Sequence, residues 1–155
     1  MIEIDVPGRE PITIEHLVLD YNGTIAEDGQ LIDGVAERLL ELGERVEVHV
    51  LTADTYGTVR EQCECLGIHI ETFPRAGAAD CKLEIVQSLG DHVMCVGNGF
   101  NDVKMFDAAA LAVAVIEKEG AFAGLLAHAD IVNTSIVDAL DLLLNTDRIR
   151  ATLRS

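Results

Sequence analysis

Short apolar runs alternate with amphipathic segments along the chain. The runs predict β-strands, because they are short and are bounded by turn residues. The segments between them place apolar residues three or four positions apart, which predicts helices with one buried face. The predicted strands are residues 2–6, 12–19, 46–51, 68–73, 92–96, 111–116 and 130–132. The predicted helices are residues 35–42, 55–66, 78–89, 101–109, 121–127 and 135–144.

The order of these elements predicts the fold class. From residue 16 onward, strand and helix alternate roughly every 20–25 residues, which is typical of a parallel sheet with helices on both faces. We therefore expect an α/β protein with three layers and a Rossmann-like, mostly parallel sheet. Pro7-Gly8 separates the first two runs and predicts an N-terminal β-hairpin, residues 1–15, that leads into a central strand. Because no connection is long enough for another domain, we expect one domain, residues 1–155.

The composition excludes several classes of function. The chain has 155 residues, 49% of them hydrophobic, which suits a compact domain with its own core. Its 27 acidic and 11 basic residues give a formal net charge of −16, which repels nucleic-acid backbones and anionic membranes. The apolar runs fall short of the roughly 20 residues of a membrane span, and the N-terminus lacks a signal pattern. We therefore expect a cytoplasmic protein without membrane insertion or nucleic-acid binding.

The cysteines and histidines show no metal-site spacing along the sequence. The four cysteines form no CxxC pair, and the nearby His69 does not complete a standard zinc spacing. The cysteines are Cys63, Cys65, Cys81 and Cys95, and the histidines are His16, His49, His69, His92 and His128. We expect reduced thiols and structural histidines.

Polar residues follow several predicted strands at the point where each strand ends. Asp20 follows one strand, Thr52-Ala53-Asp54 follow the next, and residues 97–102 follow a third. Lys82 lies early in the helix after strand 68–73. Carboxyl ends of parallel strands share one edge of the sheet, where ligands bind in such folds. We therefore expect these groups to converge, although each alone could be a helix cap or a surface residue.

The converging residue types suit phosphoryl transfer with Mg²⁺. Asp20, Asn98 and Asp102, with a carbonyl of the 20–24 turn, offer the oxygen ligands that this hard cation prefers. Gly23-Thr24 offer backbone N–H groups to a phosphate, Thr52 offers a hydroxyl, and Lys82 offers a positive charge. Asp20 would then act as a nucleophile and form an aspartyl-phosphate that water cleaves.

The four groups together resemble the ordered motifs of the haloacid dehalogenase (HAD) superfamily of phosphotransferases. The matching stretches are Asp20-Tyr21-Asn22-Gly23-Thr24, Leu51-Thr52-Ala53-Asp54, Lys82 and Gly97-Asn98-Gly99-Phe100-Asn101-Asp102. Within that superfamily the pattern is most similar to the phosphorylation domain of P-type ATPases. The chain lacks the transmembrane helices and nucleotide-binding domain of a pump. The resemblance therefore implies a HAD-like fold and a soluble, stand-alone relative.

The resemblance also implies a role for each matching residue. Asp20 would be the nucleophile and a Mg²⁺ ligand, and Asn22 would offer its backbone carbonyl to the metal. Thr52 would hold a phosphate oxygen, and Lys82 would steady Asp20 and the phosphate. The implied sets are Asp20, Asn22, Thr52 and Lys82 for catalysis, Gly23, Thr24, Thr52, Ala53 and Lys82 for phosphate binding, and Asp20, Asn22, Asn98 and Asp102 for the metal.

Two positions depart from the family pattern. HAD phosphatases carry a second acid at the position of Asn22, which protonates the leaving group and then activates water. Asn22 cannot exchange a proton near neutral pH, and general acid–base help is typically worth roughly 10²–10⁴-fold. At Asn98 the family usually has a metal-bound Asp, whereas an amide oxygen coordinates without adding charge. We expect slow breakdown of the phosphoenzyme and weaker Mg²⁺ binding, unless Asp102 becomes a direct ligand.

The short connections indicate a family member without a cap domain. Residues 25–33 resemble the flap hairpin of capless sugar-phosphate phosphatases that form tetramers, so we expect a homo-oligomer. Three functions stay open. They are hydrolysis of a small phosphorylated metabolite, a slow phosphoenzyme-forming switch related to P-type ATPases, and a catalytically inactive binding module.

Overall fold

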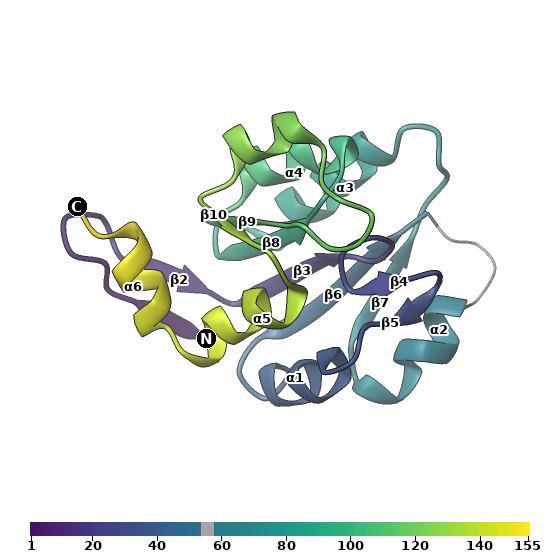
Figure 1. The fold of residues 1–155 in the computed structure, drawn as a ribbon, viewed down its shortest axis with the longest axis horizontal. Coiled ribbons are helices and arrows are strands. Elements are labelled where there is room, and N and C mark those ends of the chain that lie inside the picture. Colours follow the sequence, from purple (N-terminus) through teal and green to yellow (C-terminus); the bar gives the residue numbers. More distant parts are fainter. Residues whose placement is uncertain (54–57) are drawn as a thin grey trace.

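A six-stranded parallel sheet forms the centre of the protein in a computed structural model, which describes residues 1–53 and 58–155 (Figure 1). The strands are β3 (His16–Asp20), β6 (Glu47–Thr52), β7 (His69–Thr72), β8 (Val93–Gly97), β9 (Leu111–Val115) and β10 (Ile131–Asn133). Their order is β10-β9-β8-β3-β6-β7, and all neighbouring pairs are parallel. The predicted α/β class is confirmed, and β3 lies inside the sheet between β6 and β8.

Helices cover both faces of the sheet, which confirms the three predicted layers (Figure 1). Helices α1 (Val35–Leu42), α2 (Thr58–Cys63) and α5 (Ile136–Leu144) cover one face, and α3 (Ala78–Leu89) and α4 (Val103–Ala108) cover the other. Successive residues of a strand point to opposite faces. Leu17 therefore joins the core beneath α1 and α5, while Val18 joins the core beneath α3 and α4. Because β3 is buried on both faces, the residue at its end is held firmly.

The N-terminal residues form a separate antiparallel pair, as predicted. β1 (Ile2–Ile4) pairs with β2 (Ile12–Ile14). The prediction of one strand over residues 12–19 is wrong, because the chain changes from one sheet to the other at Glu15. The N–H of Glu15 donates to the His92 carbonyl, and its own carbonyl accepts from the N–H of Glu47. These two bonds belong to the central sheet and leave the hairpin on its own.

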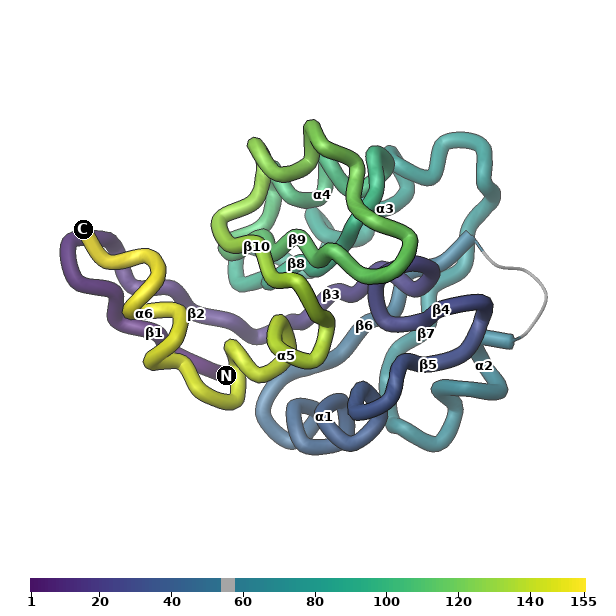
Figure 2. Tube along the Cα trace, in the orientation of Figure 1, coloured from purple at the N-terminus to yellow at the C-terminus, as the bar shows by residue number. Residues whose placement is uncertain are grey.

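A C-terminal helix that the sequence pattern did not predict, α6 (Asp147–Leu153), packs beside this hairpin. Arg150 Nε donates to the Asp5 carbonyl at 3.1 Å, and the N–H of Ser155 donates to the Pro7 carbonyl. Both chain ends consequently lie at the same end of the molecule (Figure 2).

Two segments that were predicted as α-helices are partly or wholly 3₁₀ helices in the structure. The stretch predicted as a helix over 101–109 begins as a 3₁₀ turn, Phe100–Asp102, before α4, and the one over 121–127 is a 3₁₀ helix, Ala123–His128. Both use bonds from residue i+3 to residue i. α2 (Thr58–Cys63) continues into the 3₁₀ turn Glu64–Leu66. The predicted start of that helix at residue 55, and Asp54 itself, lie outside the described residues.

The chain shows two further features that bear on the sequence-based expectations. All four cysteines are free, with Cys63 and Cys95 buried. Within residues 1–53 and 58–155, no helix is long and apolar enough to cross a bilayer.

A small hairpin follows β3 directly and contains most of the 25–33 stretch. β4 (Ala26–Glu27) pairs with β5 (Gln30–Leu31) around Asp28 and Gly29, both of which have positive φ. An Asp-Gly pair with two positive φ angles is typical of a type I′ turn. The buried Tyr21 donates its hydroxyl to the Gly29 carbonyl at 2.8 Å. The hairpin is therefore fixed to the loop that carries the first sequence motif.

Candidate active site

Asp20 is the last residue of β3 and stands at the carboxyl edge of the sheet. The chain then turns sharply, because the N–H groups of Thr24, Ile25 and Ala26 all point to the Tyr21 carbonyl. This turn brings the Thr24 hydroxyl back to Asp20, where it donates to Oδ2 at 2.9 Å. The first motif therefore places a nearly buried carboxylate and a bound hydroxyl at one point.

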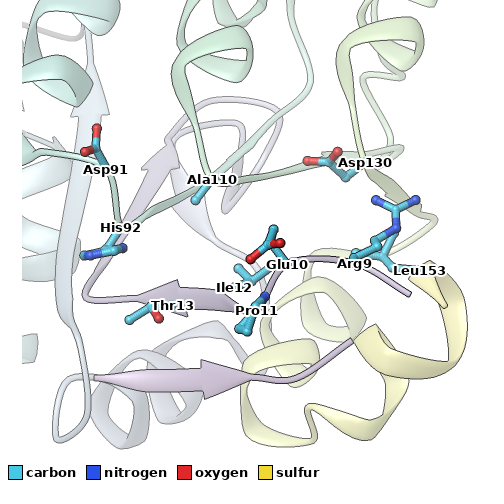
Figure 3. Close-up of a pocket in the computed structure, with 10 residues that line it drawn as sticks. All are labelled: Arg9, Glu10, Pro11, Ile12, Thr13, Asp91, His92, Ala110, Asp130 and Leu153. Carbon is cyan, nitrogen blue, oxygen red and sulfur yellow. The ribbon is translucent and has the colours of Figure 1, made fainter. Parts of the chain in front are cut away.

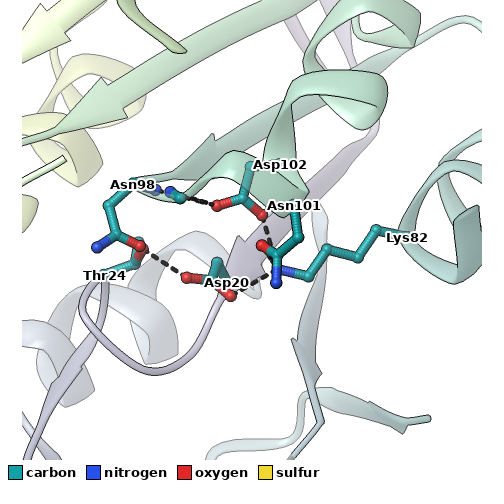
Figure 4. Close-up of polar contacts among 7 residues, drawn as sticks. Asp20, Thr24, Lys82, Asn98, Asn101 and Asp102 are labelled. Carbon is teal, nitrogen blue, oxygen red and sulfur yellow. Dashed lines mark hydrogen bonds and ion pairs between the residues drawn. The ribbon is translucent and has the colours of Figure 1, made fainter. Parts of the chain in front are cut away.

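Lys82 joins Asp20 to Asp102 beneath this edge (Figure 4). Its Nζ lies 2.7 Å from Asp20 Oδ1, 2.6 Å from Asp102 Oδ1 and 3.1 Å from Asn101 Oδ1. The side chain is 2% exposed, because Lys82 belongs to the buried stripe of α3 between Ala78 and Val86. A Lys at a core position of an amphipathic helix is a signal that sequence reasoning can use. The alternative of a solvated surface Lys is excluded.

Asp102 acts both as a turn cap and as an ion-pair partner. Its Oδ2 accepts from the N–H groups of Asn98 at 3.1 Å and Gly99 at 3.0 Å, while Oδ1 faces Lys82. A Cβ on Gly97 would collide with this carboxylate, so the glycine allows the close approach. Asp102 is completely buried and every oxygen has a partner.

Asn98 presents its amide oxygen toward Asp20. Its Nδ2 donates to the Gly120 carbonyl at 3.1 Å, and this bond fixes which end of the amide faces the site. The Thr24 hydroxyl lies 3.3 Å from Asn98 Oδ1 and 2.9 Å from Asp20 Oδ2. Two oxygens that could bind a cation therefore meet at Thr24 (Figure 4).

The site holds two carboxylates and one ammonium group within a largely buried space. Burial and the nearby Asp102 carboxylate raise the pKa of Asp20 to about 6, although Lys82 and Thr24 act in the opposite direction. Burial lowers the pKa of Lys82, but the two carboxylates together raise it above its ordinary value. Lys82 is thus charged at pH 7, and the negative charge around Asp20 is only partly offset.

An open hollow of about 450 Å³ lies above Asp20. The residues lining it are Asp20, Asn22, Thr52, Ala53, Phe73, Lys82, Asn98, Gly99, Phe100, Asn101 and Glu119. The structure therefore brings together all four of the predicted groups except Asp54, which is not described. Thr52 is buried at 3% exposure, whereas Asn22 is exposed.

Gly23 and Thr24 lie differently from the expectation that their N–H groups face a phosphate. The N–H of Gly23 donates to the Ala26 carbonyl, and that of Thr24 to the Tyr21 carbonyl. The tight turn uses both groups for its own closure. Gly23 also has φ +79°, and a Cβ there would approach Asn98 Nδ2 and Glu119 Oε2 at 2.5 Å. Gly23 therefore serves the shape of the turn in this structure.

Sequence reasoning missed two groups at the hollow. Asn101 Oδ1 accepts from Lys82, and its place inside the last motif was the signal that could have found it. Glu119 reaches Gly23 and the hollow from the loop after β9. No motif marks Glu119, because its approach depends on how that loop folds over the site. Its carboxylate lies close to the Asn98 side chain. Position 98 is the one at which the HAD motif usually has an Asp.

The donor set fits a hard divalent cation such as Mg²⁺. All the available donors are oxygens, and the raised pKa of Asp20 reflects a buried charge that a cation would offset. Asp20 and Asn98 are placed to hold it, and the turn bonds to the Tyr21 carbonyl do not use the Asn22 carbonyl. Asp102 has both oxygens occupied, so it fits a supporting position better than that of a direct ligand.

A larger hollow, of about 580 Å³, lies at the opposite edge of the sheet beside the N-terminal hairpin (Figure 3). Its polar lining mixes Arg9, Glu10, Asp91 and Asp130, and Asp130 accepts from the N–H of Ala112. Asp20, Thr52 and Lys82 are all absent from this lining. The larger of these two hollows is therefore not the one that contains the candidate catalytic residues.

Several solved structures that share this fold are named as phosphatases. The cobalt-bound deoxy-D-mannose-octulosonate 8-phosphate phosphatase of Haemophilus influenzae has a TM-score of 0.73 at 14% identity and covers 92% of this chain and 94% of its own. The 3-deoxy-D-manno-octulosonate 8-phosphate phosphatase of Moraxella catarrhalis, bound to magnesium, phosphate and KDO, has a TM-score of 0.66 at 20% identity. The match covers 91% of this chain and 94% of that chain. The 3-deoxy-D-manno-octulosonate 8-phosphate phosphatase of Yersinia pestis has a TM-score of 0.68 at 18% identity, and the match covers 90% of this chain and 84% of that chain. The fold of this chain is therefore HAD-like.

Two archaeal proteins are similar in sequence. Uncharacterized protein MJ0073 of Methanocaldococcus jannaschii is 41% identical over 78 residues, which are 47% of this chain and 84% of that protein. Uncharacterized protein MJ0072 of the same organism is 56% identical over 39 residues, which are 25% of this chain and 89% of that protein. The chain belongs to the same family as these two proteins. No family model matches the chain.

Removing the charge of Lys82 is expected to destabilise the fold strongly. Lys82→Met keeps the stem of the side chain but leaves two buried carboxylates without a cation, which costs roughly 3–5 kcal/mol of unfolding free energy. Urea unfolding at pH 7 in EDTA measures this loss. Lys104→Met is the matched control, because Lys104 is exposed and pairs with the exposed Asp80, a contact worth at most about 1 kcal/mol. Equal losses in both variants would contradict the buried charge balance.

Proposed function

We propose that this protein is a Mg²⁺-dependent phosphohydrolase that acts on a small phosphomonoester through an aspartyl-phosphate on Asp20. The observation that carries the proposal is the Asp20 carboxylate, held by Lys82 at 2.7 Å and by Thr24 at 2.9 Å on the floor of an open hollow. A carboxylate fixed in this way can approach phosphorus without first ordering its side chain. Thr52 lies beside it on the neighbouring strand.

The reaction proceeds in two displacements at phosphorus. The Asp20 carboxylate attacks, the bond from phosphorus to the ester oxygen breaks, and the alcohol leaves with a proton from solvent. Water then attacks the same phosphorus, and inorganic phosphate leaves as the Asp20 carboxylate is restored. Lys82 and the Thr52 hydroxyl hold the phosphoryl oxygens in both steps. Mg²⁺, held by Asp20, Asn98 and the Asn22 carbonyl, supplies positive charge to the transferring group when it is bound.

The open hollow and the structural neighbours support a small phosphorylated molecule as the substrate. Those neighbours are named as phosphatases of a sugar-acid 8-phosphate, and most residues that line the hollow have polar side chains, which suits a small, polar phosphate ester. We assign a phosphorylated small metabolite as substrate and a cytoplasmic location, where such metabolites occur.

Asn22 favours a second candidate, a slow phosphoenzyme-forming switch. Asn22 lines the hollow but cannot donate or accept a proton in catalysis. P-type ATPases, which the motifs resemble, also lack an acid at this position. A long-lived adduct on Asp20 would then be the functional state. An inactive binding module fits less well, because the buried pair of Asp20 and Lys82 costs stability that a passive scaffold has no need to retain.

One experiment separates these functions. The protein is incubated with p-nitrophenyl phosphate or acetyl phosphate, with Mg²⁺ or with EDTA, and both phosphate release and acid-trapped phosphoprotein are measured. The hydrolase gives continuous release that requires Mg²⁺. The switch gives about one equivalent of trapped phosphate per chain with little release. Neither signal over a panel of sugar phosphates would reject both catalytic functions.

We also propose that the protein self-associates through the hairpin of residues 25–33. The hairpin follows the turn that carries Asn22, which lines the hollow. Lys118, next to Glu119 in the loop after β9, lies 3.3 Å from Glu27 of the hairpin. A second copy seated there would narrow access to Asp20. Light scattering is expected to give a mass that is a multiple of the 16.7 kDa chain. A mass of one chain at the assay concentration would reject this arrangement.

A further inference from the structure

At the amino edge of the sheet, opposite the candidate active site, His16, His49 and His69 lie in one cluster with Glu47. His16 begins β3, Glu47 begins β6 and His69 begins β7. The parallel register sets His16 beside Glu47 and His49 beside His69, and Glu47 and His49 are two apart on one strand. All four side chains therefore project from the same face of three adjacent strands.

The donor atoms of three of these side chains meet closely. His16 Nδ1 lies 3.1 Å from His49 Nε2 and 3.4 Å from Glu47 Oε2, and His49 Nε2 lies 3.8 Å from the same Glu47 oxygen. The three residues form a group in which each offers one ligand atom. His69 Nε2 lies 4.0 Å from Glu47 Oε2.

These separations match the edges of a tetrahedral metal site. Zinc binds imidazole nitrogen at about 2.0–2.1 Å and carboxylate oxygen at about 2.0–2.2 Å, which puts neighbouring ligand atoms of a tetrahedron roughly 3.3–3.4 Å apart. The three observed separations, 3.1, 3.4 and 3.8 Å, lie around that value. Only small side-chain rotations would be needed to place one cation at bonding distance from all three atoms.

His49 is held in place for such a role. It is 6% exposed and packs between two imidazoles, with ring centroids 5.2 Å from His16 and 4.8 Å from His69. The His49 and His69 rings are stacked at 19°. A simple hydrogen bond between His16 and His49 would explain one distance. It would not explain why the Glu47 carboxylate lies close to both of these imidazoles, or why the His69 imidazole also lies close to Glu47.

We propose that His16, Glu47 and His49 bind a divalent transition metal of the Zn²⁺ class at the amino edge of the sheet. The fourth position would be filled by His69 after a small rotation, or by water. Imidazole with one carboxylate suits Zn²⁺, Co²⁺ or Ni²⁺, whereas Mg²⁺ prefers an all-oxygen set. The exposed Glu47, with 62% of its side chain accessible, leaves a path for the ion to enter. The metal would link β3 to β6, and also to β7 where His69 is the fourth ligand, and it is separate from the chemistry at the other edge.

Calorimetric titration of Zn²⁺ into the full, tag-free chain tests this site. The protein is first stripped with EDTA and then held in millimolar Mg²⁺, so that Zn²⁺ does not fill the oxygen-rich site. One equivalent is expected to bind and to raise the melting temperature. His16→Gln and Glu47→Gln are each expected to weaken the affinity at least about 10-fold. Both residues are partly or largely exposed, so these variants are expected to remain folded.

Two controls locate the metal. His128→Gln is expected to bind Zn²⁺ as the wild type does, because His128 pairs with Asp107 on another part of the surface. Asp20→Asn is also expected to keep full affinity, since it removes the main ligand of the other site. Binding lost in Asp20→Asn, binding unaffected by both ligand variants, or no stoichiometric binding would overturn the proposal. None of these readouts depends on catalytic activity, so they are independent of the proposed function.

Discussion

Asp20→Asn is expected to abolish phosphoryl transfer and, at the same time, to stabilise the metal-free protein. The amide cannot attack phosphorus, so release of phosphate and the trapped phosphoprotein should both fall at least about 10³-fold. The amide oxygen can still accept from Lys82, and the amide N–H group can donate to the Thr24 hydroxyl oxygen, which then turns its own proton away. Lys82 then faces a single carboxylate, that of Asp102, so the buried charges balance.

The stability gain has a defined pH dependence. Burial and Asp102 raise the pKa of Asp20 from an ordinary 3.8 to about 6. Because the folded-state pKa is raised, this group favours folding at low pH, and that contribution is lost as the pH rises from about 4 through about 6. The Asp20→Asn variant has no carboxyl group to ionise at this position, so it does not lose this stability as the pH rises. In EDTA at pH 7 it should be more stable than the wild type by roughly 1–3 kcal/mol, and near pH 4 the difference should shrink.

Thermal and urea unfolding across pH 4–8 measure this difference. Asp91→Asn is the matched control, because Asp91 lies at the opposite edge of the sheet (Figure 3), and it should change neither activity nor the pH profile. Saturating Mg²⁺ should stabilise the wild type more than the Asp20→Asn variant. An active Asp20→Asn protein would reject Asp20 as nucleophile, and a destabilised one would reject the charge balance described for the site.

Asn22→Asp is expected to raise turnover by roughly 10²-fold. The side chain is exposed and lines the hollow beside Asp20, so an acid there can protonate the leaving alcohol and then activate water. Phosphoenzyme breakdown should accelerate more than its formation, because breakdown needs a base to activate water, whereas p-nitrophenolate or acetate leaves without help from an acid. The trapped phosphoprotein should therefore decrease while phosphate release increases, and both are read from one time course.

Asn22→Ala separates this chemistry from a change of shape. It adds no acid and should leave turnover near that of the wild type, with its backbone carbonyl unaltered. Stability should change by less than about 0.5 kcal/mol in both variants, because the position is exposed. If Asn22→Asp and wild type turn over equally, Asn22 does not limit the reaction, and the slow-switch function loses its support.

Local patterns in the sequence predicted most of the central sheet. A strand that is buried on both faces shows a continuous apolar run without polar alternation, so it can be predicted without a structure. Strand β3 is such a run and ends at the charged residue Asp20. Helix α3 was predicted with its observed bounds, since its apolar stripe and closing Gly90 are local signals. The order of the motifs also predicted that Asp20, Lys82 and Asp102 would meet.

Other elements carried too weak a local signal. The hairpin of β4 and β5 has two residues in each strand, too few to show a period, so that only the resemblance of residues 25–33 to a flap hairpin indicated it. The change of sheet at Glu15 depends on bonds to His92 and Glu47, both far away in sequence. Helix α6 depends on packing against the N-terminal hairpin, and neither segment alone indicates that contact.

The sequence by itself determined the α/β class, the convergence of the motif residues on one edge and the absence of an acid at Asn22. Only the tertiary structure decided the state of Asp20, which depends on burial and on two partners more than 60 positions away. It also brought Glu119 to the hollow and placed His16, Glu47 and His49 together at the opposite edge. Strand register sets those last contacts, and register depends on pairing between distant segments, which no local pattern records.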